Sequence, residues 1–289
     1  MNRFVEVVLK NWDQLHTLAD RLIFSVFRGQ ADSSWPLSTS LERYLDQAED
    51  FTEDTAYCEH LMLDQIKRKS QLYMSSMPAP DDDVEWLAIL QHHGCPTRLL
   101  DFSWSPYVAT YFAVIEGHND AALWALDWRI PRDRLAARFN VQYHTGAKDE
   151  VDRRHVALAN RFVGFREPSH KSAAVIPFEP QRLTERMSRQ KGLFVMPSRG
   201  DWPFMKNLWA AYGAKATSSQ SLAPLAISDV LNINFFSDKY CPYVLKIILP
   251  ADLRAAAIRN LSQMNITAET LFGGLDGFAK SLAQTVILT

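Results

Sequence analysis

Residues 91–117 read QHHGCPTRLLDFSWSPYVATYFAVIEG and contain the clearest local signals in the chain. Ser105 is a favourable N-cap, and Pro106 suits the first helical position, where its missing N–H is not needed. Apolar side chains then recur with the spacing of one helix face. They are Val108, Tyr111, Phe112 and Ile115. The sequence therefore predicts a helix that begins at Pro106 and ends at Gly117.

A second helix is predicted immediately upstream, from Asp83 to about His93. Asp83 is a suitable cap, and an apolar row follows it at helical spacing. The row consists of Val84, Leu87 and Leu90. Gly94 and Pro96 end this helix, because glycine accepts the left-handed cap conformation and proline cannot continue a helix.

Apolar runs in the rest of the chain predict strands and further helices. The run Ile23–Phe27 predicts a buried strand that leaves Arg28 and Gly29 at its end. Further strands are predicted at residues 122–128, 173–178, 193–196 and 243–249, and further helices at residues 11–22, 252–264, 268–272 and 278–283. This irregular order indicates an α+β protein with a mixed or split β-sheet core flanked by helices.

One long helix is predicted to begin near Thr52, with Tyr57, Leu61, Met62, Ile66 and Tyr73 on its inward face. The chain has 289 residues, which suits a single domain over residues 1–289. Residues 138–171 hold seven Lys or Arg, four Asp or Glu and three His. We interpret them as an elaboration that contacts a macromolecular target, either protein or nucleic acid. A solvated helical face is the alternative.

The composition predicts a folded protein of the reducing cytoplasm. Apolar residues make up 47% of the chain, and the formal net charge of −2 gives no general affinity for nucleic acid. Three widely spaced cysteines form neither a disulfide framework nor a zinc motif, so no metal site is predicted. The sequence shows no signal peptide and no membrane-spanning run. GxGxxG, P-loop and HExxH motifs do not occur.

The first candidate site residues are Arg28, Gly29 and Gln30, directly after an apolar run. An arginine at the end of a buried strand is costly to bury unless an anion meets it. Its planar guanidinium suits two-point contact with a phosphate or carboxylate, and Gly29 lets a ligand approach the backbone. The alternative is an arginine paired with a structural carboxylate at the edge of the sheet.

The second candidate segment runs from Thr97 to Ser105, at the start of the predicted helix. Free N–H groups and the helix dipole make this end an anion site. Ser103 and Ser105 could donate to a phosphate or a ribose hydroxyl, and Asp101 could accept from ribose. Alternatively, Ser105 is only a helix cap, and Arg98 forms a local ion pair with Asp101.

His92 and His93 precede this segment, but adjacent helical residues point to different faces and make poor joint metal ligands. A nuclease that uses one of them with Asp101 is a further interpretation, although no second base or metal ligand is identifiable.

The third candidate is Gln190, which stands before the predicted strand at residues 193–196. Its amide matches a ribose or amide edge. Alternatively, it is an ordinary polar residue that leads into a strand.

Together these residues resemble the FRG family, which is named for its Phe-Arg-Gly motif. That motif is matched here by residues 27–29. The other matching segments occur in the family's order, at residues 40–43, 91–101, 105–106, 109–113, 190–194 and 271–277. The resemblance covers about residues 20–285 and implies one FRG domain with its core in that range.

A more distant similarity links three of these segments to mono-ADP-ribosyltransferases. Those enzymes often carry Arg-Gly at the end of the first strand, a serine on a strand before an Ala-x-x-Phe helix, and a later glutamate. Arg28, Ser103 and Gln190 look like these three stations. The similarity implies that they respectively clamp the pyrophosphate of NAD, hold its ribose and occupy the catalytic-acid position. Because Gln190 is neutral, the carboxylate would come from Asp101 or Glu185.

The resulting hypothesis is an NAD-using ADP-ribosyltransferase-like protein that acts as an effector in antiphage defence or in a toxin–antitoxin pair. Its predicted catalytic residues are Arg28, Ser103 and Gln190. The residues predicted to bind NAD are Arg28, Gly29, Gln30, Thr97, Arg98, Asp101 and Ser105. The alternative is a module that senses a nucleotide or a nucleic-acid end without chemistry, and the neutral Gln190 favours it.

Overall fold

A seven-stranded mixed β-sheet forms the centre of the molecule, with strand order β1-β7-β4-β2-β3-β6-β5. The computed structural model describes residues 3–47, 55–142, 148–163, 173–182, 184–213, 224–231 and 240–288. The strands are β1 (Arg3–Val8), β2 (Ser25–Gln30), β3 (Leu100–Ser103), β4 (Ala121–Asp127), β5 (Val175–Phe178), β6 (Gly192–Pro197) and β7 (Tyr240–Leu249). β1 and β7 run parallel, and the other neighbouring pairs of this sheet are antiparallel.

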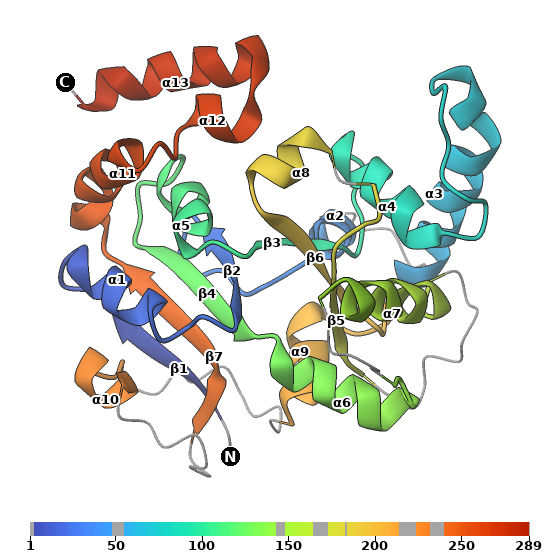
Figure 1. The fold of residues 1–289 in the computed structure, drawn as a ribbon, viewed down its shortest axis with the longest axis horizontal. Helices are drawn as coiled ribbons and strands as arrows, with labels where there is room; N and C mark the ends of the chain where they lie inside the picture. Colours follow the sequence, from blue (N-terminus) through green and yellow to red (C-terminus); the bar gives the residue numbers. More distant parts are fainter. Residues whose placement is uncertain are drawn as a thin grey trace.

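Helices surround this sheet (Figure 1). In the first half of the chain they are α1 (Asp13–Ala19), α2 (Ser40–Asp46), α3 (Thr55–Lys69), α4 (Asp83–His92), α5 (Pro106–Val114) and α6 (Arg129–Phe139). In the second half they are α7 (Lys148–Arg161), α8 (Glu185–Arg189), α9 (Phe204–Tyr212), α10 (Ile227–Leu231), α11 (Arg254–Gln263), α12 (Ala268–Phe272) and α13 (Gly274–Leu288). Single 3₁₀ turns occur at Ser70–Leu72 and Ala251–Leu253.

Two separate groups of helices cover one face of the sheet. α1, α5, α11 and α12 pack with Phe27 of β2 and with β4 and β7, at the left of Figure 1. α3, α4 and α7 pack with Phe194 of β6 and with β5, at the right. Phe27 and Phe194 share a face, because Phe27 pairs with Ser103 while Asp101, two residues along β3, pairs with Phe194. The opposite face packs on α9.

The two halves of the sheet meet along a short seam between β2 and β3. These strands pair only at Phe27 and Ser103. By contrast, β2 pairs with β4 from Ser25 to Gln30, and β3 pairs with β6 along its whole length. The seam lies where the two groups of helices separate, so it forms the floor of a cavity. The prediction of an α+β protein with a mixed or split sheet is confirmed.

The strongest sequence signals correspond to real elements. Ser105 caps α5 by accepting a hydrogen bond from the Val108 N–H at 3.3 Å, and Pro106 is the first helical residue. The strands predicted at residues 122–128, 173–178, 193–196 and 243–249 match β4, β5, β6 and β7. The helix at residues 268–272 has its predicted bounds. Asp82, rather than Asp83, caps α4, and Asp83 instead pairs with Lys67.

The strand predicted at Ile23–Phe27 was placed two residues too early. The strand runs over Ser25–Gln30, so Arg28 lies within it rather than at its end. Ile23 and Phe24 are 71% and 41% exposed because they belong to the turn before the strand. The ring of Phe24 packs under the guanidinium of Arg129 at 3.9 Å instead of entering the core.

The inward face predicted for the long helix was only partly right: Met62 and Ile66 are half-buried, and Ile66 packs against the core, but the other three residues are exposed. Tyr57 and Leu61 are 40% and 44% exposed, and Tyr73, beyond the helix, is 81% exposed. The buried side chains of α3 are Glu59 and Leu63. The physical reason is that the helix turns a carboxylate toward a buried arginine, which an apolar pattern does not reveal. The predicted start at Thr52 lies outside the described residues.

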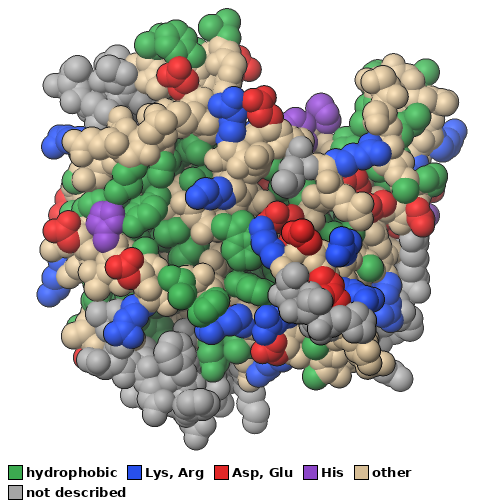
Figure 2. Space-filling view, in the orientation of Figure 1, with side chains coloured by type: hydrophobic (Ala, Val, Ile, Leu, Met, Phe, Trp, Pro, Cys, Tyr) green, Lys and Arg blue, Asp and Glu red, His purple; other side chains and the backbone are tan. Residues whose placement is uncertain are grey.

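Several elements were not predicted from local sequence patterns: β1, α2, β3, α6, α8, α9 and α10. In the region interpreted as an elaboration, α7 buries Val156, Leu158 and Ala159 in the same cluster as β5 and β6. Side chains of both charges are mixed over α6 and α7 (Figure 2). In the part of the chain that the structure describes, no helix is long and apolar enough to cross a membrane.

Candidate functional site

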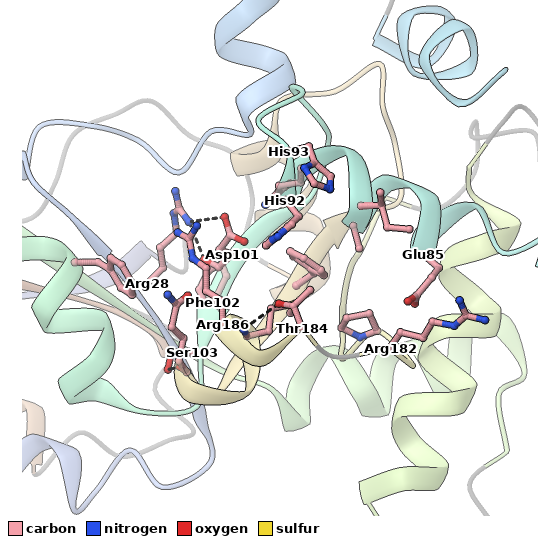
Figure 3. Close-up of a pocket in the computed structure, with 18 of the residues that line it drawn as sticks. Arg28, Glu85, His92, His93, Asp101, Phe102, Ser103, Arg182, Thr184 and Arg186 are labelled. Atoms are coloured by element: carbon pink, nitrogen blue, oxygen red, sulfur yellow. Dashed lines mark hydrogen bonds and ion pairs between the residues drawn. The ribbon is translucent and has the colours of Figure 1, made fainter. Parts of the chain in front are cut away.

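A cavity of about 470 Å³ opens above the seam between β2 and β3 (Figure 3). β2 and β3 form its floor, and α4, α5 and α8, together with Pro180, Arg182 and Thr184, form its walls. Its volume is typical of small-molecule sites, which span about 300–1,000 Å³. The lining residues are Phe27, Arg28, Gly29, Met74, Glu85, Ala88, Ile89, Gln91, His92, His93, Asp101, Phe102, Ser103, Ala109, Phe112, Pro180, Arg182, Thr184, Arg186, Met187, Gln190 and Phe194.

Arg28 bridges the seam. Its Nη1 donates a hydrogen bond to the backbone carbonyl of Asp101 at 2.7 Å, and the same atom lies 4.0 Å from the Asp101 carboxylate. The guanidinium therefore contacts a carbonyl of β3 where main-chain pairing between β2 and β3 has stopped. Burial lowers the pKa of Arg28 and the Asp101 charge raises it, but an arginine stays protonated at neutral pH.

Arg28 keeps donors that no described protein group uses. Its Nε is buried and has no hydrogen-bond partner among the described residues. Its side chain is 20% exposed, and it borders the cavity. Most buried polar groups in proteins are satisfied, so this guanidinium donor beside a cavity is unusual and is free to bond a molecule in the cavity.

Ser103 and Gln190 also line the cavity, and they contact each other. The Ser103 hydroxyl donates to the Gln190 carbonyl at 2.8 Å and accepts from the Ser105 N–H at 3.0 Å. The Gln190 side-chain amide donates to the Leu271 carbonyl at 3.2 Å. Ser103 can therefore meet a ligand only through its second lone pair, whereas Gln190 can use its Oε1 oxygen and its second amide N–H.

Asp101 and Gly29 complete the set of predicted residues that meet at the cavity. The Asp101 side chain is 67% exposed, so its carboxylate is open to ligand and solvent. Gly29 has a different role from the one expected. A Cβ atom there would lie 1.9 Å from the Ala109 carbonyl oxygen and 2.7 Å from the Ala113 nitrogen. Glycine is needed because β2 packs directly on the backbone of α5, and Gly29 has no positive φ.

The other predicted NAD-binding residues do not line the cavity. Gln30 accepts from the Trp124 indole at 2.7 Å and donates to the Pro36 carbonyl at 3.0 Å. Thr97 donates to the Gln91 side chain and accepts from the Leu99 N–H, and Ser105 caps α5. Arg98 is buried in an ion pair with Glu59, with a closest N–O distance of 2.5 Å.

Both histidines border the cavity, but their surroundings differ. Figure 3 shows His92 directed into the cavity, between the Arg28–Asp101 end and the wall carrying Thr184, with His93 beyond it. Burial lowers the pKa of His92, and the nearby His93 and Arg186 lower it further, so the ring is neutral at pH 7. Within the described ranges, no group of His, Cys, Asp and Glu side chains could hold a metal ion.

Several cavity residues were missed in the sequence. Glu85, Arg182, Thr184 and Arg186 all border the cavity. Arg182 and Arg186 add two cations to Arg28, and the Arg186 guanidinium lies 4.8 Å from the centre of the Phe272 ring. The spacing of cavity-lining residues on α4 was a usable signal, because Glu85, Ala88, Ile89 and His92 follow i, i+3, i+4 and i+7.

The structure distinguishes between the two residues considered as the catalytic acid in place of Gln190. Glu185 is exposed on α8, where it pairs with Arg189 at 2.7 Å, and it does not line the cavity. Asp101 lines the cavity beside Arg28. Of the two, only Asp101 is placed where a carboxylate could act on a ligand held by Arg28.

Comparison with known protein families gives one match. Residues 24–122 match the FRG domain, and they include Arg28, α4, β3 and α5. The chain contains an FRG domain. Its matched part supplies the seam, Asp101, Ser103 and one wall of the cavity, whereas Gln190 and Arg186 come from the chain beyond it. Neither a curated protein nor a solved structure matches the chain.

Proposed function

We propose that the cavity of this FRG-domain protein binds NAD, and that the protein is an ADP-ribosyltransferase-like enzyme. The observation that supports this most directly is that Arg28, Ser103 and Gln190 line one cavity although they lie far apart in the sequence. The resemblance gives each of them a role toward NAD, and those roles require that the three side chains meet. An arrangement in separate parts of the molecule would have contradicted the proposal.

The charges of the cavity fit the pyrophosphate of NAD. Arg28 and Arg186 both border it, and Arg28 has a buried Nε donor without a partner. Guanidinium groups bind phosphate oxygens through several hydrogen bonds at once. The aromatic rings of Phe27 and Phe112 give apolar surface beside these cations. Small-molecule sites typically combine such surface with a few polar groups.

In the proposed reaction, the bond between nicotinamide and the ribose C1 breaks, and nicotinamide leaves with the bonding electrons. A nucleophile on the target, or water, then forms a bond to C1 and loses its proton. Positive charge develops on the ribose, and the Asp101 carboxylate is the acid of the cavity nearest to Arg28 that could stabilise it. The neutral ring of His92 could accept the proton. Gln190 would orient the ligand through Oε1.

A direct test is to incubate the purified full chain with labelled NAD, with and without cell lysate, and to measure nicotinamide release and label transfer. We expect activity from the wild type and a loss of about 100-fold or more in Arg28→Ala. Arg259→Ala is the matched control, because Arg259 is an exposed arginine on α11 that does not line the cavity. An inactive wild type, or equal losses in both variants, would contradict the enzyme proposal.

A second candidate function is a nucleotide-sensing module without chemistry. It is favoured by Gln190, which is neutral and already bonded to the Leu271 carbonyl, and by Ser103, whose only proton is donated to Gln190. Calorimetry with NAD, ADP-ribose and a short RNA separates the two functions. Tight NAD binding without nicotinamide release would favour the sensor. Binding of RNA alone would contradict both NAD-based proposals.

The biological setting is also part of the proposal: an effector that acts inside bacterial cells, in antiphage defence or as a toxin. Support comes only from the resemblance to the FRG family. Controlled expression in bacteria, with growth and phage plaque counts as measurements, tests it. Growth arrest or phage protection by the wild type, lost in Arg28→Ala, is the expected result. Normal growth and unchanged plaque counts would contradict it.

A further inference from the structure

The cavity extends well beyond the residues that the ADP-ribosyltransferase similarity addresses. Glu85 and Arg182 lie at one end, and Arg28 and Asp101 lie at the other, with His92 between them (Figure 3). Glu85 and His92 are seven residues apart on α4, a rise of about 10 Å along the helix. The cavity is therefore long enough to hold two chemically different parts of one ligand.

The two ends differ in polarity. The Arg28 end carries cationic donors and the exposed Asp101 carboxylate. At the Glu85 end the charges of Glu85 and Arg182 offset each other, and the neighbouring lining is apolar, from Ala88 and Ile89 on the next turn of α4 and from Pro180. Flat aromatic rings are bound in proteins between apolar walls of this kind, with a few polar groups that fix their orientation. The Glu85 end therefore suits a ring rather than a phosphate.

Glu85 supplies the polar group at this end. It is buried, with 4% of its surface exposed, yet it borders the cavity. Burial and the nearby Asp82 raise the pKa of its carboxyl group, while backbone hydrogen bonds from Arg182 and Gln181 lower it. A carboxylate offers about four acceptor positions, so two backbone donors leave room for a donor from a ligand. An ionised carboxylate accepts hydrogen bonds only, and it disfavours a carbonyl oxygen facing it.

We infer that the Glu85 end of the cavity is a base subsite that selects a nucleobase with an exocyclic amino group, as adenine has, through a hydrogen bond donated to Glu85. This inference rests on the proposed function, which assigns the pyrophosphate to the Arg28 end. The base subsite would bind the part of the ligand to which Arg28, Ser103 and Gln190 are not assigned. A base with a carbonyl in place of the amino group, such as hypoxanthine, is then disfavoured.

The test compares ligands that differ only at this group. Binding of ADP-ribose, inosine diphosphate ribose, adenosine and inosine to the full chain is measured by calorimetry. We expect the wild type to prefer each adenine ligand over its hypoxanthine partner by about tenfold or more, as for a hydrogen bond to a charged group. In Glu85→Gln, whose amide can both donate and accept, the preference should fall to about twofold or less.

Glu185→Gln is the matched control, because it makes the same chemical change on an exposed glutamate outside the cavity. It should keep the full preference for adenine. Glu85 also accepts hydrogen bonds from the backbone of residues 181 and 182. If Glu85→Gln fails to fold for that reason, the ratio of wild-type affinities for adenine and hypoxanthine ligands still tests the inference. Equal wild-type affinity for adenine and hypoxanthine ligands would overturn the inference.

The two nucleosides separate this inference from the proposed function. They carry no phosphate, so they report on the base subsite alone. Preferential adenosine binding, with no gain in affinity for ADP-ribose, would support the base subsite and contradict the assignment of pyrophosphate to Arg28. Tight but unselective binding of both diphosphate riboses would support the NAD site and overturn the role of Glu85. No binding of any of the four ligands would overturn both.

Discussion

Arg28 and Arg98 both belong to motifs that resemble the FRG family, and both were predicted to bind a ligand, but their surroundings are opposite. Arg98 lies behind the cavity, among α3, α4 and α7, and its side chain is 3% exposed. Its Nε donates to Glu59 at 2.7 Å and its Nη1 to the Phe162 carbonyl at 3.1 Å. Arg28 borders the cavity, makes one hydrogen bond to a carbonyl and has a buried Nε without a described partner.

The difference shows how a structural arginine is distinguished from one that is available to a ligand. A guanidinium has five N–H donors, and those of Arg98 face a carboxylate and a carbonyl supplied by the fold itself. Arg28 faces a carboxylate only at 4.0 Å, beside open space. We therefore expect changes around Arg98 to affect mainly stability, and changes at Arg28 to affect mainly binding.

The largest expected effect is at the partner of Arg98. Glu59→Gln should lower the free energy of unfolding by about 3–5 kcal/mol, because it leaves a buried guanidinium without a counter-charge. Urea unfolding followed by circular dichroism measures the change. The double variant Glu59→Leu with Arg98→Met removes both charges and should regain most of the stability. A cost below about 1 kcal/mol for Glu59→Gln would mean that the pair is not structural.

Glycines beside the two arginines give the next comparison. Gly29→Ala should cost about 3 kcal/mol, because the new Cβ would meet the backbone of α5 at 1.9 Å and neither element can yield. Gly200→Ala is the matched change near Arg98, where the Cβ would lie 3.0 Å from a guanidinium nitrogen. A side chain yields more easily than a backbone, so we expect about 1 kcal/mol there. Chemical unfolding of both variants measures the two costs, and the reverse ranking would contradict the packing argument.

His155, buried in the core, and His92, at the cavity, allow the same comparison for the pH dependence of stability. His155 on α7 is buried and bonded to the Pro177 carbonyl at 2.6 Å, and burial lowers its pKa to about 4. Between this pKa and the ordinary value near 6.5, the unfolded chain binds a proton that the folded protein does not. Stability from His155 is therefore complete above the unfolded pKa and is lost as the pH falls toward the folded pKa.

The expected size is about 2 kcal/mol between pH 7 and pH 4.5. It is measured as the difference in unfolding free energy between wild type and His155→Gln, which removes contributions from other groups. That difference should shrink as the pH is lowered. A pH-independent difference would contradict a neutral buried ring. His92→Gln, at the cavity, should have a smaller effect on this profile, because its pKa is lowered less and the ring is partly exposed.

The smallest expected effect on stability is at Arg28 itself. Arg28→Lys should change the unfolding free energy by about 1 kcal/mol or less, because it removes one hydrogen bond at the edge of the cavity. Affinity for ADP-ribose should nevertheless fall about tenfold or more, since lysine cannot make the two-point contact of a guanidinium. Calorimetry and urea unfolding of the same samples give both numbers. If Arg28→Lys lowered the unfolding free energy as much as Glu59→Gln does, Arg28 would be a structural arginine like Arg98.

The sequence predicted those parts of the fold whose causes are local. The capping preference of Ser105 and the fixed φ of Pro106 mark the start of α5. The apolar runs of β4 and β7 are long enough to be recognised as strands from the sequence alone. β1 could not be recognised in this way, because it is completed by β7, more than 200 residues later. The inward face of α3 was only partly predicted for a related reason: Glu59 is buried to meet an arginine from a distant segment.

The site was predictable in its outline and not in its details. Arg28, Asp101, Ser103 and Gln190 were singled out from sequence, and they line one cavity. No local sequence pattern, however, distinguishes Arg28 from Arg98, because the difference depends on the position of Glu59 in the fold. Glu85 was missed because its place on α4 looks like an ordinary charged first turn. Its place at the cavity depends on Pro180 and Arg182, which line the same cavity from a distant part of the chain.

Main-chain pairing between the two halves of the sheet depends on one residue pair, Phe27 with Ser103. Four strands lie on one side of this junction and three on the other, each half tied together by its own ladders and covered by its own helices. The opposite face is shared, because strands of both halves pack with α9 in one apolar cluster, so the two halves are held together mainly from that side. A ligand seated in the cavity would connect the two halves on the other face as well, so its binding should be detectable as slower amide exchange in β2 and β3, the strands that form the cavity floor.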